Sequence, residues 1–99
     1  MEARLNHLVC FGYGLSARTL ARRLDRANWR VSASFRKAPP PAGEQVHGFR
    51  FGDALPSDAT HLLVSAPPDE TGDPVLRTYG GAIATLKALR WTGYLSTTG

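Results

Sequence analysis

A turn of small residues, placed between an apolar run and an amphipathic segment, has the most readily assigned chemistry. The run at 8–11 (LVCF) leads into Gly12-Tyr13-Gly14-Leu15-Ser16-Ala17, a G-x-G-x-x-A pattern. Gly12 permits dihedral angles closed to other residues, Gly14 leaves the backbone bare for a pyrophosphate, and Ala17 lets a helix pack closely on a strand. The N–H groups of the first helical turn would face the phosphates. The turn predicts a dinucleotide-binding site; the alternative is an ordinary strand-to-helix turn.

The end of the second predicted strand decides which dinucleotide such a site would take. NAD-binding proteins usually place an acid there for the ribose hydroxyls, whereas this sequence has Ser34-Phe35-Arg36-Lys37. Arg36 and Lys37, with Ser34 beside them, would pair with a ribose phosphate. We therefore expect NADP(H) in preference to NAD(H). The alternative is a solvated Arg-Lys turn.

Other strand ends add candidate cofactor contacts at the same edge. Asp53 follows the third predicted strand, where its carboxylate would either accept a hydrogen bond from an adenine amino group or cap a turn. Ser65-Ala66-Pro67 ends the fourth strand with small residues, which would let the nicotinamide ribose lie against the backbone.

The elements that position these residues alternate between strand and helix. Strands are predicted at 7–11, 30–35, 46–51, 61–66 and 91–95, and helices at 15–27 and 75–89. The links around the third strand, at 37–45 and 52–60, are nine residues each, too short for full helices, so we expect loops or single turns there. The pattern predicts an α/β fold, a Rossmann-like open parallel sheet of order 3-2-1-4-5 with flanking helices. Ligands then bind at the carboxyl ends of the strands.

The two helices carry further expectations. Asn28 is expected to stop the first helix in a left-handed conformation. The cationic face of this helix is expected to be solvated; it comprises Arg18, Arg22, Arg23 and Arg26. Pro74 suits the first turn of the second helix, and Gly80-Gly81 would allow close packing on the sheet. Its apolar face is expected to comprise Leu76, Tyr79, Ile83, Leu86 and Leu89.

Length and charge bound the class of protein. The 99 residues hold one domain at most, and we expect 1–99 to be the N-terminal part of an NAD(P)-binding Rossmann domain whose C-terminal substrate region is absent. The net charge is +4, but the basic residues form no block, so nucleic acid is not expected as a partner. His7, His47 and His61 are too scattered for a metal site.

The single cysteine and the N-terminus indicate the compartment. Cys10 lies in a strand that reads as buried, which excludes an internal disulfide and fits a reducing environment. No apolar run at the N-terminus is long enough for a signal peptide or a membrane span. We therefore expect a cytoplasmic protein without a membrane partner.

Four segments together resemble a known family. G-Y-G-L-S-A, S-F-R-K, H-L-L-V-S-A-P-P and G-Y-L-S-T-T-G resemble the short-chain dehydrogenase/reductase superfamily, most closely its extended or atypical branch of NAD(P)-dependent nucleotide-sugar epimerase and dehydratase-like proteins. The resemblance covers nearly the whole chain. It implies hydride transfer at the nicotinamide C4, with Thr97 as the catalytic hydroxyl that hydrogen-bonds the reacting oxygen and Ser96 beside it. The extended branch usually has G-x-x-G-x-x-G, so the turn here favours an atypical member.

The tyrosine that would move the proton in this family lies in a Tyr-x-x-x-Lys pair. Tyr13, Tyr79 and Tyr94 each lack a lysine four residues later. The sequence thus predicts the cofactor-binding half of an NADP-dependent oxidoreductase or a nucleotide-sugar epimerase or dehydratase-like enzyme, acting on a small-molecule substrate. The alternatives are a non-catalytic, NADP-binding redox-sensing regulator of the same fold and an inactive truncated product.

Overall fold

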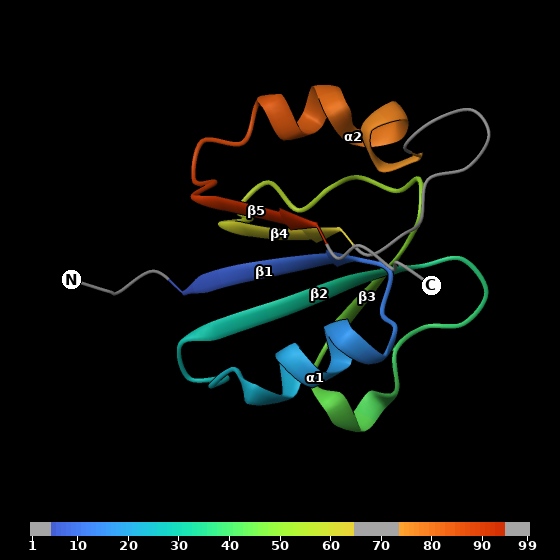
Figure 1. The fold of residues 1–99 in the computed structure, drawn as a ribbon, viewed down its shortest axis with the longest axis vertical. Coiled ribbons are helices and arrows are strands. Elements are labelled where there is room, and N and C mark those ends of the chain that lie inside the picture. The colour runs from blue at the N-terminus through green and yellow to red at the C-terminus, as the bar shows by residue number, and fades with distance from the viewer. Residues whose placement is uncertain (1–4, 65–73, 95–99) are drawn as a thin grey trace.

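Five parallel strands form one sheet in the computed structural model, which describes residues 5–64 and 74–94 (Figure 1). The strands are β1 (Asn6–Phe11), β2 (Trp29–Phe35), β3 (His47–Arg50), β4 (His61–Val64) and β5 (Trp91–Tyr94). Their order is β3-β2-β1-β4-β5, and each neighbouring pair is parallel. The predicted α/β Rossmann-like arrangement is confirmed.

β1 lies at the centre of the sheet and is covered on both faces. The helix α1 (Leu15–Arg23) packs on one face and α2 (Pro74–Ala84) on the other (Figure 1). Leu8 and Cys10 belong to the apolar cluster on the α1 side, and Val9 and Phe11 belong to the cluster on the α2 side. Burial raises the pKa of the Cys10 thiol to about 12, against a weaker opposing effect of Arg26, so this free cysteine is an inert part of the core.

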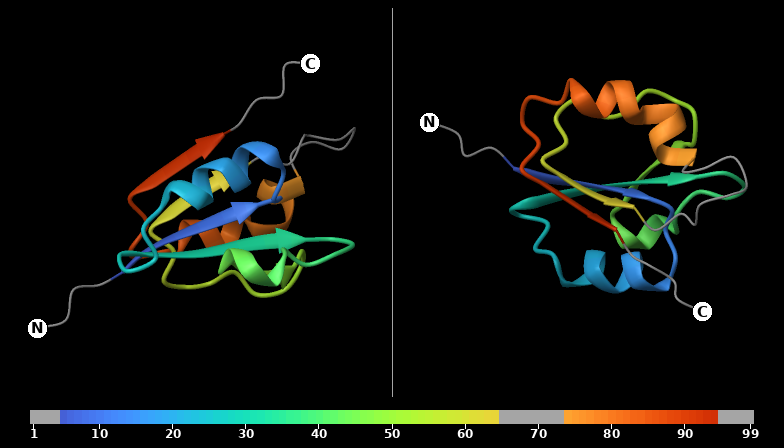
Figure 2. Two further views of the ribbon diagram at one scale, coloured as in Figure 1. Left: turned by 90° about the horizontal axis from the view of Figure 1, so that it is seen from below. Right: turned by 45° about the horizontal axis from the view of Figure 1, so that its top comes forward.

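The connections on either side of β3 are as short as expected. The β2–β3 connection contains a single 3-10 turn, η1 (Ala42–Glu44), which lies beside α1 (Figure 2). The β3–β4 connection has no helix and crosses the face that α2 also covers (Figure 1). Tyr79 of α2 anchors this connection, because its hydroxyl accepts a hydrogen bond from Gly52 N at 2.8 Å and donates one to Asp53 O at 2.7 Å.

α1 ends at Arg23, four residues before the predicted end at Ala27. Asp25 directs the chain into a turn, because its carbonyl accepts hydrogen bonds from Asn28 N at 3.0 Å and Trp29 N at 2.8 Å. The prediction that Asn28 stops the helix in a left-handed conformation is wrong. Gln45 is the non-glycine residue with a positive φ in the described part of the chain.

α2 ends at Ala84 rather than near residue 89, and its predicted apolar face is wrong at one position, Leu76. Val75 is fully buried, whereas Leu76 is 52% exposed. Tyr79 is buried as expected, and Ile83, Leu86 and Leu89 pack against the same cluster. A Cβ built on Gly80 or Gly81 meets no atom within 4 Å, so close packing on the sheet is not the reason for these glycines.

An aromatic row crosses the amino end of the sheet. The ring centroids of Trp29 and His61 are 4.7 Å apart, and those of His61 and Trp91 are 6.2 Å apart. Trp29 packs against the cluster on the α1 side, while Trp91 is 47% exposed.

Candidate nucleotide-binding site

The glycine turn lies at the carboxyl end of β1 and leads directly into α1. Gly12 has a φ of 94°, a conformation that favours glycine. Gly14 is the N-cap residue of α1, and no side chain caps the helix there. Ala17 is fully buried against the cluster that contains Leu8 and Cys10. The first and third small positions therefore meet internal requirements of backbone and packing.

Gly14 has no such internal requirement. Its φ of −82° is open to any residue, and a Cβ built there meets no atom within 4 Å. Gly14 lines a cavity of about 660 Å³. Bare backbone beside a helix start and an open cavity suits the close approach of a phosphate, so the turn fits the dinucleotide that the sequence predicts.

The cavity brings together two of the predicted segments. Its wall consists of residues 12–18, residues 34–41 and Phe51. Arg18, Arg36 and Lys37 contribute three cationic side chains, and no carboxylate belongs to the wall that the described residues form. The cavity therefore has the charge that an anionic ligand requires.

Arg36 and Arg50 pack on aromatic rings where β2 and β3 end. The guanidinium of Arg36 lies 4.4 Å from the ring centroid of Phe51, and that of Arg50 lies 5.3 Å from that of Phe35. Such cation–π contacts hold the Arg36 side chain at the cavity wall. Lys37 takes part in no ion pair within residues 5–64 and 74–94.

Ser34 has a positioning role in addition to the cofactor contact predicted for it. Its buried hydroxyl accepts a hydrogen bond from Gly12 N at 2.9 Å. This contact joins the glycine turn to the end of β2, so two segments of the cavity wall are held together.

Glu44 was not among the predicted site residues, yet it holds the turn and the cavity wall. Its side chain is 12% exposed. The Oε1 atom accepts a hydrogen bond from the Tyr13 hydroxyl at 2.7 Å, and Oε2 accepts one from Arg18 Nη2 at 2.6 Å and one from Arg22 Nη2 at 3.4 Å. Arg26 adds contacts to the carbonyl oxygens of Glu44 at 3.1 Å and Gln45 at 3.2 Å.

The predicted solvated face of α1 is therefore wrong for Arg18, Arg22 and Arg26, which bind η1. Arg18 and Arg22 are four residues apart and lie on one side of α1, and that spacing is the signal that could have indicated a partner segment. Arg26 follows the end of the helix.

The contacts in this cluster shift the pKa values of Glu44 and Tyr13. Hydrogen bonds from Arg18 and then Tyr13 lower the pKa of Glu44 from 4.5 to about 2. Burial, followed by the hydrogen bond to Glu44, raises the pKa of the Tyr13 hydroxyl to about 12. Glu44 is thus ionised and Tyr13 neutral over the whole range in which the protein would work.

The other predicted site residues lie away from this cavity or outside the described residues. Asp53 is exposed in a turn and is not part of the cavity wall. Its backbone N donates to Arg50 O at 2.9 Å. Ser65, Ala66, Pro67, Ser96 and Thr97, predicted as cofactor contacts and catalytic hydroxyl, fall outside the residues that the structure describes.

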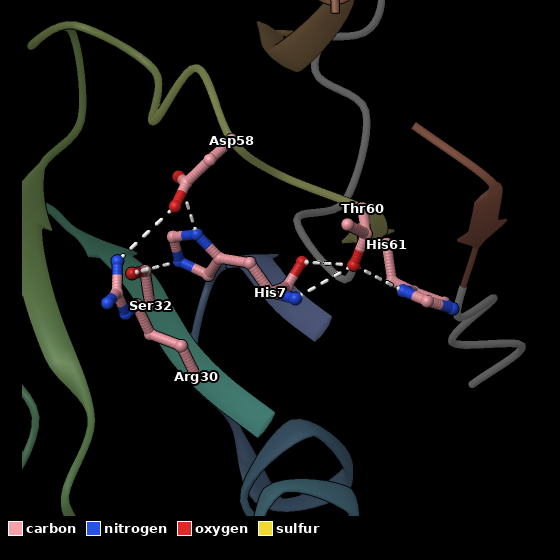
Figure 3. A network of polar contacts seen from close by, with 6 residues as sticks. All are labelled: His7, Arg30, Ser32, Asp58, Thr60 and His61. Atoms are coloured by element: carbon pink, nitrogen blue, oxygen red, sulfur yellow. Dashed lines mark hydrogen bonds and ion pairs between the residues drawn. The ribbon is translucent and has the colours of Figure 1, made fainter. Parts of the chain in front are cut away.

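A second polar cluster, centred on His7, lies at the amino end of the sheet (Figure 3). His7 Nδ1 is 2.8 Å from Asp58 Oδ1, and Nε2 is 2.7 Å from Ser32 Oγ. Thr60 completes the cluster, because its Oγ1 accepts a hydrogen bond from His7 N at 2.8 Å and its own N donates to His7 O at 3.0 Å. None of these contacts was predicted from the sequence.

The order of groups in this cluster is that of a Ser-His-Asp hydrolase, but the exposure is reversed. Ser32 is 1% exposed, whereas the side chain of Asp58 is 60% exposed. A nucleophile must be reachable and its orienting acid sheltered. Burial raises the pKa of Asp58, but the hydrogen bond and charge of His7 outweigh it, so the net shift is downward. The cluster fixes the helix-free β3–β4 connection to the sheet.

The fold and the cavity define an α/β protein with a Rossmann-like parallel sheet and a glycine turn at its carboxyl edge. A solved structure described as a functionally unknown conserved protein from Silicibacter pomeroyi DSS is 36% identical, with a TM-score of 0.78 over 94% of this chain. The chain spans 36% of the length of that protein. No protein-family model and no curated protein matches the sequence.

Two kinds of feature are absent from the described residues. None of their helices is long and apolar enough to span a membrane. No three His, Cys, Asp or Glu residues among them are grouped so that they could hold a metal ion.

Proposed function

We propose that this chain is the NADP(H)-binding part of an oxidoreductase, or of a nucleotide-sugar epimerase or dehydratase-like enzyme, of the short-chain dehydrogenase/reductase type. The observation that carries the proposal is Gly14, whose bare backbone faces an open cavity although nothing within the protein requires glycine there. A pyrophosphate at this position would receive N–H groups from the first turn of α1.

The cationic wall favours the phosphorylated form of the dinucleotide. Arg36 and Lys37 follow β2, where a ribose 2′-phosphate would lie, and the wall contains no acid among the described residues to bind ribose hydroxyls. Arg36, packed on Phe51, offers a flat cationic surface at this position. Ser34 and Glu44 would act through the backbone and side chains that they hold.

A bound nicotinamide dinucleotide would supply hydride transfer at C4 of its nicotinamide ring. The residues of this chain would bind and orient it. Thr97, as the resemblance implies, would hydrogen-bond the reacting oxygen of a small-molecule substrate. The Tyr-x-x-x-Lys pair of that family does not occur in residues 1–99.

Titration calorimetry of the chain with NADPH and with NADH tests the proposal. We expect NADPH to bind with a Kd roughly ten times lower than that of NADH, the ratio produced by one or two charge-assisted hydrogen bonds to a phosphate. Equal binding, or tighter binding of NADH, would contradict the assignment of the cationic wall. Absence of binding by both would contradict the proposed function.

A further inference from the structure

Tyr79 connects α2 to the turn that follows β3. It is buried, and its hydroxyl bonds two consecutive residues of that turn, since it accepts from Gly52 N at 2.8 Å and donates to Asp53 O at 2.7 Å. Gly52 has a φ of 107°, which favours glycine. Burial raises the pKa of the Tyr79 hydroxyl, so the group keeps the proton that it donates. One side chain of α2 therefore fixes the backbone where β3 ends.

Two ring contacts extend from Tyr79 to the cavity at the glycine turn. The ring of Phe51 stands edge-on to that of Tyr79, with centroids 5.3 Å apart and an angle of 89° between the planes. The guanidinium of Arg36 lies 4.4 Å from the centroid of the Phe51 ring. Phe51 and Arg36 both line the cavity, whereas Tyr79 does not belong to the wall that the described residues form. Tyr79 thus contacts the cavity wall from behind.

Arg36 remains available to a ligand in this arrangement. It is exposed, and it forms no ion pair within residues 5–64 and 74–94. The Phe51 ring holds the guanidinium by a cation–π contact, which leaves its planar set of N–H donors for an anion. A cationic side chain that is oriented before the ligand arrives loses less entropy on binding.

We propose that Tyr79 is a positioning residue for NADPH preference: it holds the turn at 51–53, and through Phe51 it holds the Arg36 guanidinium where the ribose 2′-phosphate would bind. This inference rests on the proposed function. It adds a residue from α2, on the opposite face of the sheet from α1 (Figure 1). Its chain of contacts is complete in the folded protein, from the hydroxyl to the turn and from ring to ring to guanidinium.

The first test compares Tyr79→Phe with Thr78→Val. Tyr79→Phe keeps the ring and removes the hydroxyl that holds the turn. We expect NADPH to bind about threefold to fivefold more weakly while NADH affinity changes by less than about twofold, since only NADPH would use Arg36. Thr78→Val removes a hydroxyl from the exposed neighbouring position of α2 and should leave both affinities within about twofold. Equal weakening of both dinucleotides by Tyr79→Phe would overturn the positioning role.

A double-mutant cycle tests whether Tyr79 acts through Arg36. Arg36→Gln alone should weaken NADPH binding roughly tenfold. Because the guanidinium is then absent, adding Tyr79→Phe should produce no further loss of the NADPH-to-NADH preference. Additive losses in the double variant would overturn the inference, since they would show that Tyr79 does not act through Arg36.

Proton NMR of the ligand-free chain separates this inference from the proposed function. The Phe51 ring current should shift the side-chain protons of Arg36 upfield in the wild type, and Tyr79→Phe should lose part of that shift. An unchanged shift, or an NADPH preference that Tyr79→Phe leaves intact, would overturn the inference while the proposed function stands. If the shift responds as expected but the wild type binds neither dinucleotide, the proposed function and the role in NADPH preference both fail, and only the contact from Tyr79 to Arg36 stands.

Discussion

The two ends of the sheet carry polar clusters of similar setting and opposite character. The cavity at the carboxyl end has a volume of about 660 Å³, and two cavities at the amino end have volumes of about 750 and 720 Å³. Volume therefore does not distinguish them. At the amino end, the ring nitrogens of His7 and the hydroxyls of Ser32 and Thr60 have protein partners.

The carboxyl end instead directs polar groups towards open space. Gly14 exposes bare backbone beside the cavity, and Lys37 forms no ion pair within the described ranges. Polar groups that satisfy one another hold a fold together, whereas polar groups that converge on a cavity await a ligand. The difference supports a structural role for the amino end and agrees with the proposed binding site at the carboxyl end, where open parallel sheets usually bind ligands.

The largest expected effect separates the two ends through stability. His7→Ala removes the hydrogen-bond partner of the buried Ser32 hydroxyl and the contact that ties Asp58 of the β3–β4 connection to the sheet. The free energy of unfolding should therefore fall by about 2–4 kcal/mol. Urea denaturation measures the change, and NADPH affinity of the folded protein should stay within about twofold. His47→Ala removes an exposed histidine from β3 and should cost less than about 0.5 kcal/mol. A loss of affinity in His7→Ala without loss of stability would reverse the roles of the two ends.

Gly14→Ser should change binding and stability in opposite directions. Serine is a good N-cap residue, so the free energy of unfolding should rise by a few tenths of a kcal/mol. The serine side chain would extend into the cavity, and its hydroxyl would accept hydrogen bonds from the N–H groups that are proposed to bind a phosphate. NADPH affinity should therefore fall roughly tenfold, about 1.4 kcal/mol, by calorimetry.

The same substitution at Gly81, where a Cβ also meets open space, is the matched control for Gly14→Ser. It should leave NADPH affinity unchanged. An unaltered affinity in Gly14→Ser itself would remove the main support for a phosphate at the turn.

The smallest expected effect is a pH dependence of stability at the carboxyl end of the sheet. The pKa of Glu44 is lowered from 4.5 to about 2, so the ionised side chain stabilises the fold fully above pH 4.5 and loses that contribution as the pH falls towards 2. The difference in urea midpoint between the wild type and Glu44→Gln should be constant above about pH 5.5 and should narrow below pH 4.5. A difference that is the same at pH 7 and pH 3 would show that the charge of Glu44 does not stabilise η1 on α1.

Local patterns sufficed to predict the sheet. The strand order follows from the apolar runs and from the change to helical spacing after Gly14. The absence of α-helices from the connections around β3 follows from the shortness of these links. The end of α1 could not be predicted in this way, because the hydrogen bonds to the Asp25 carbonyl replace a further helical turn. At the start of α2 the sequence pattern placed Leu76 in the core, whereas the fold buries its neighbour Val75 instead.

The side-chain clusters could not be predicted because their partners are distant in the sequence. Arg18 and Glu44 are 26 residues apart, and His7 and Asp58 are 51 residues apart. A polar side chain with no partner nearby in the sequence is predicted to be solvated, and only the folded chain shows its contact. The glycine turn was recognisable since all of its members are consecutive.

The aromatic row at the amino end has a spectroscopic consequence. Trp29 and Trp91, the two tryptophans of the chain, both lie against His61. Burial, with a smaller contribution from Arg90, lowers the pKa of His61 below 6.5. Because a protonated imidazole quenches a neighbouring indole, the emission of the protein should brighten as the pH rises through this lowered pKa. Tryptophan fluorescence would thus report the protonation of His61, at the end of the sheet opposite the proposed cofactor site.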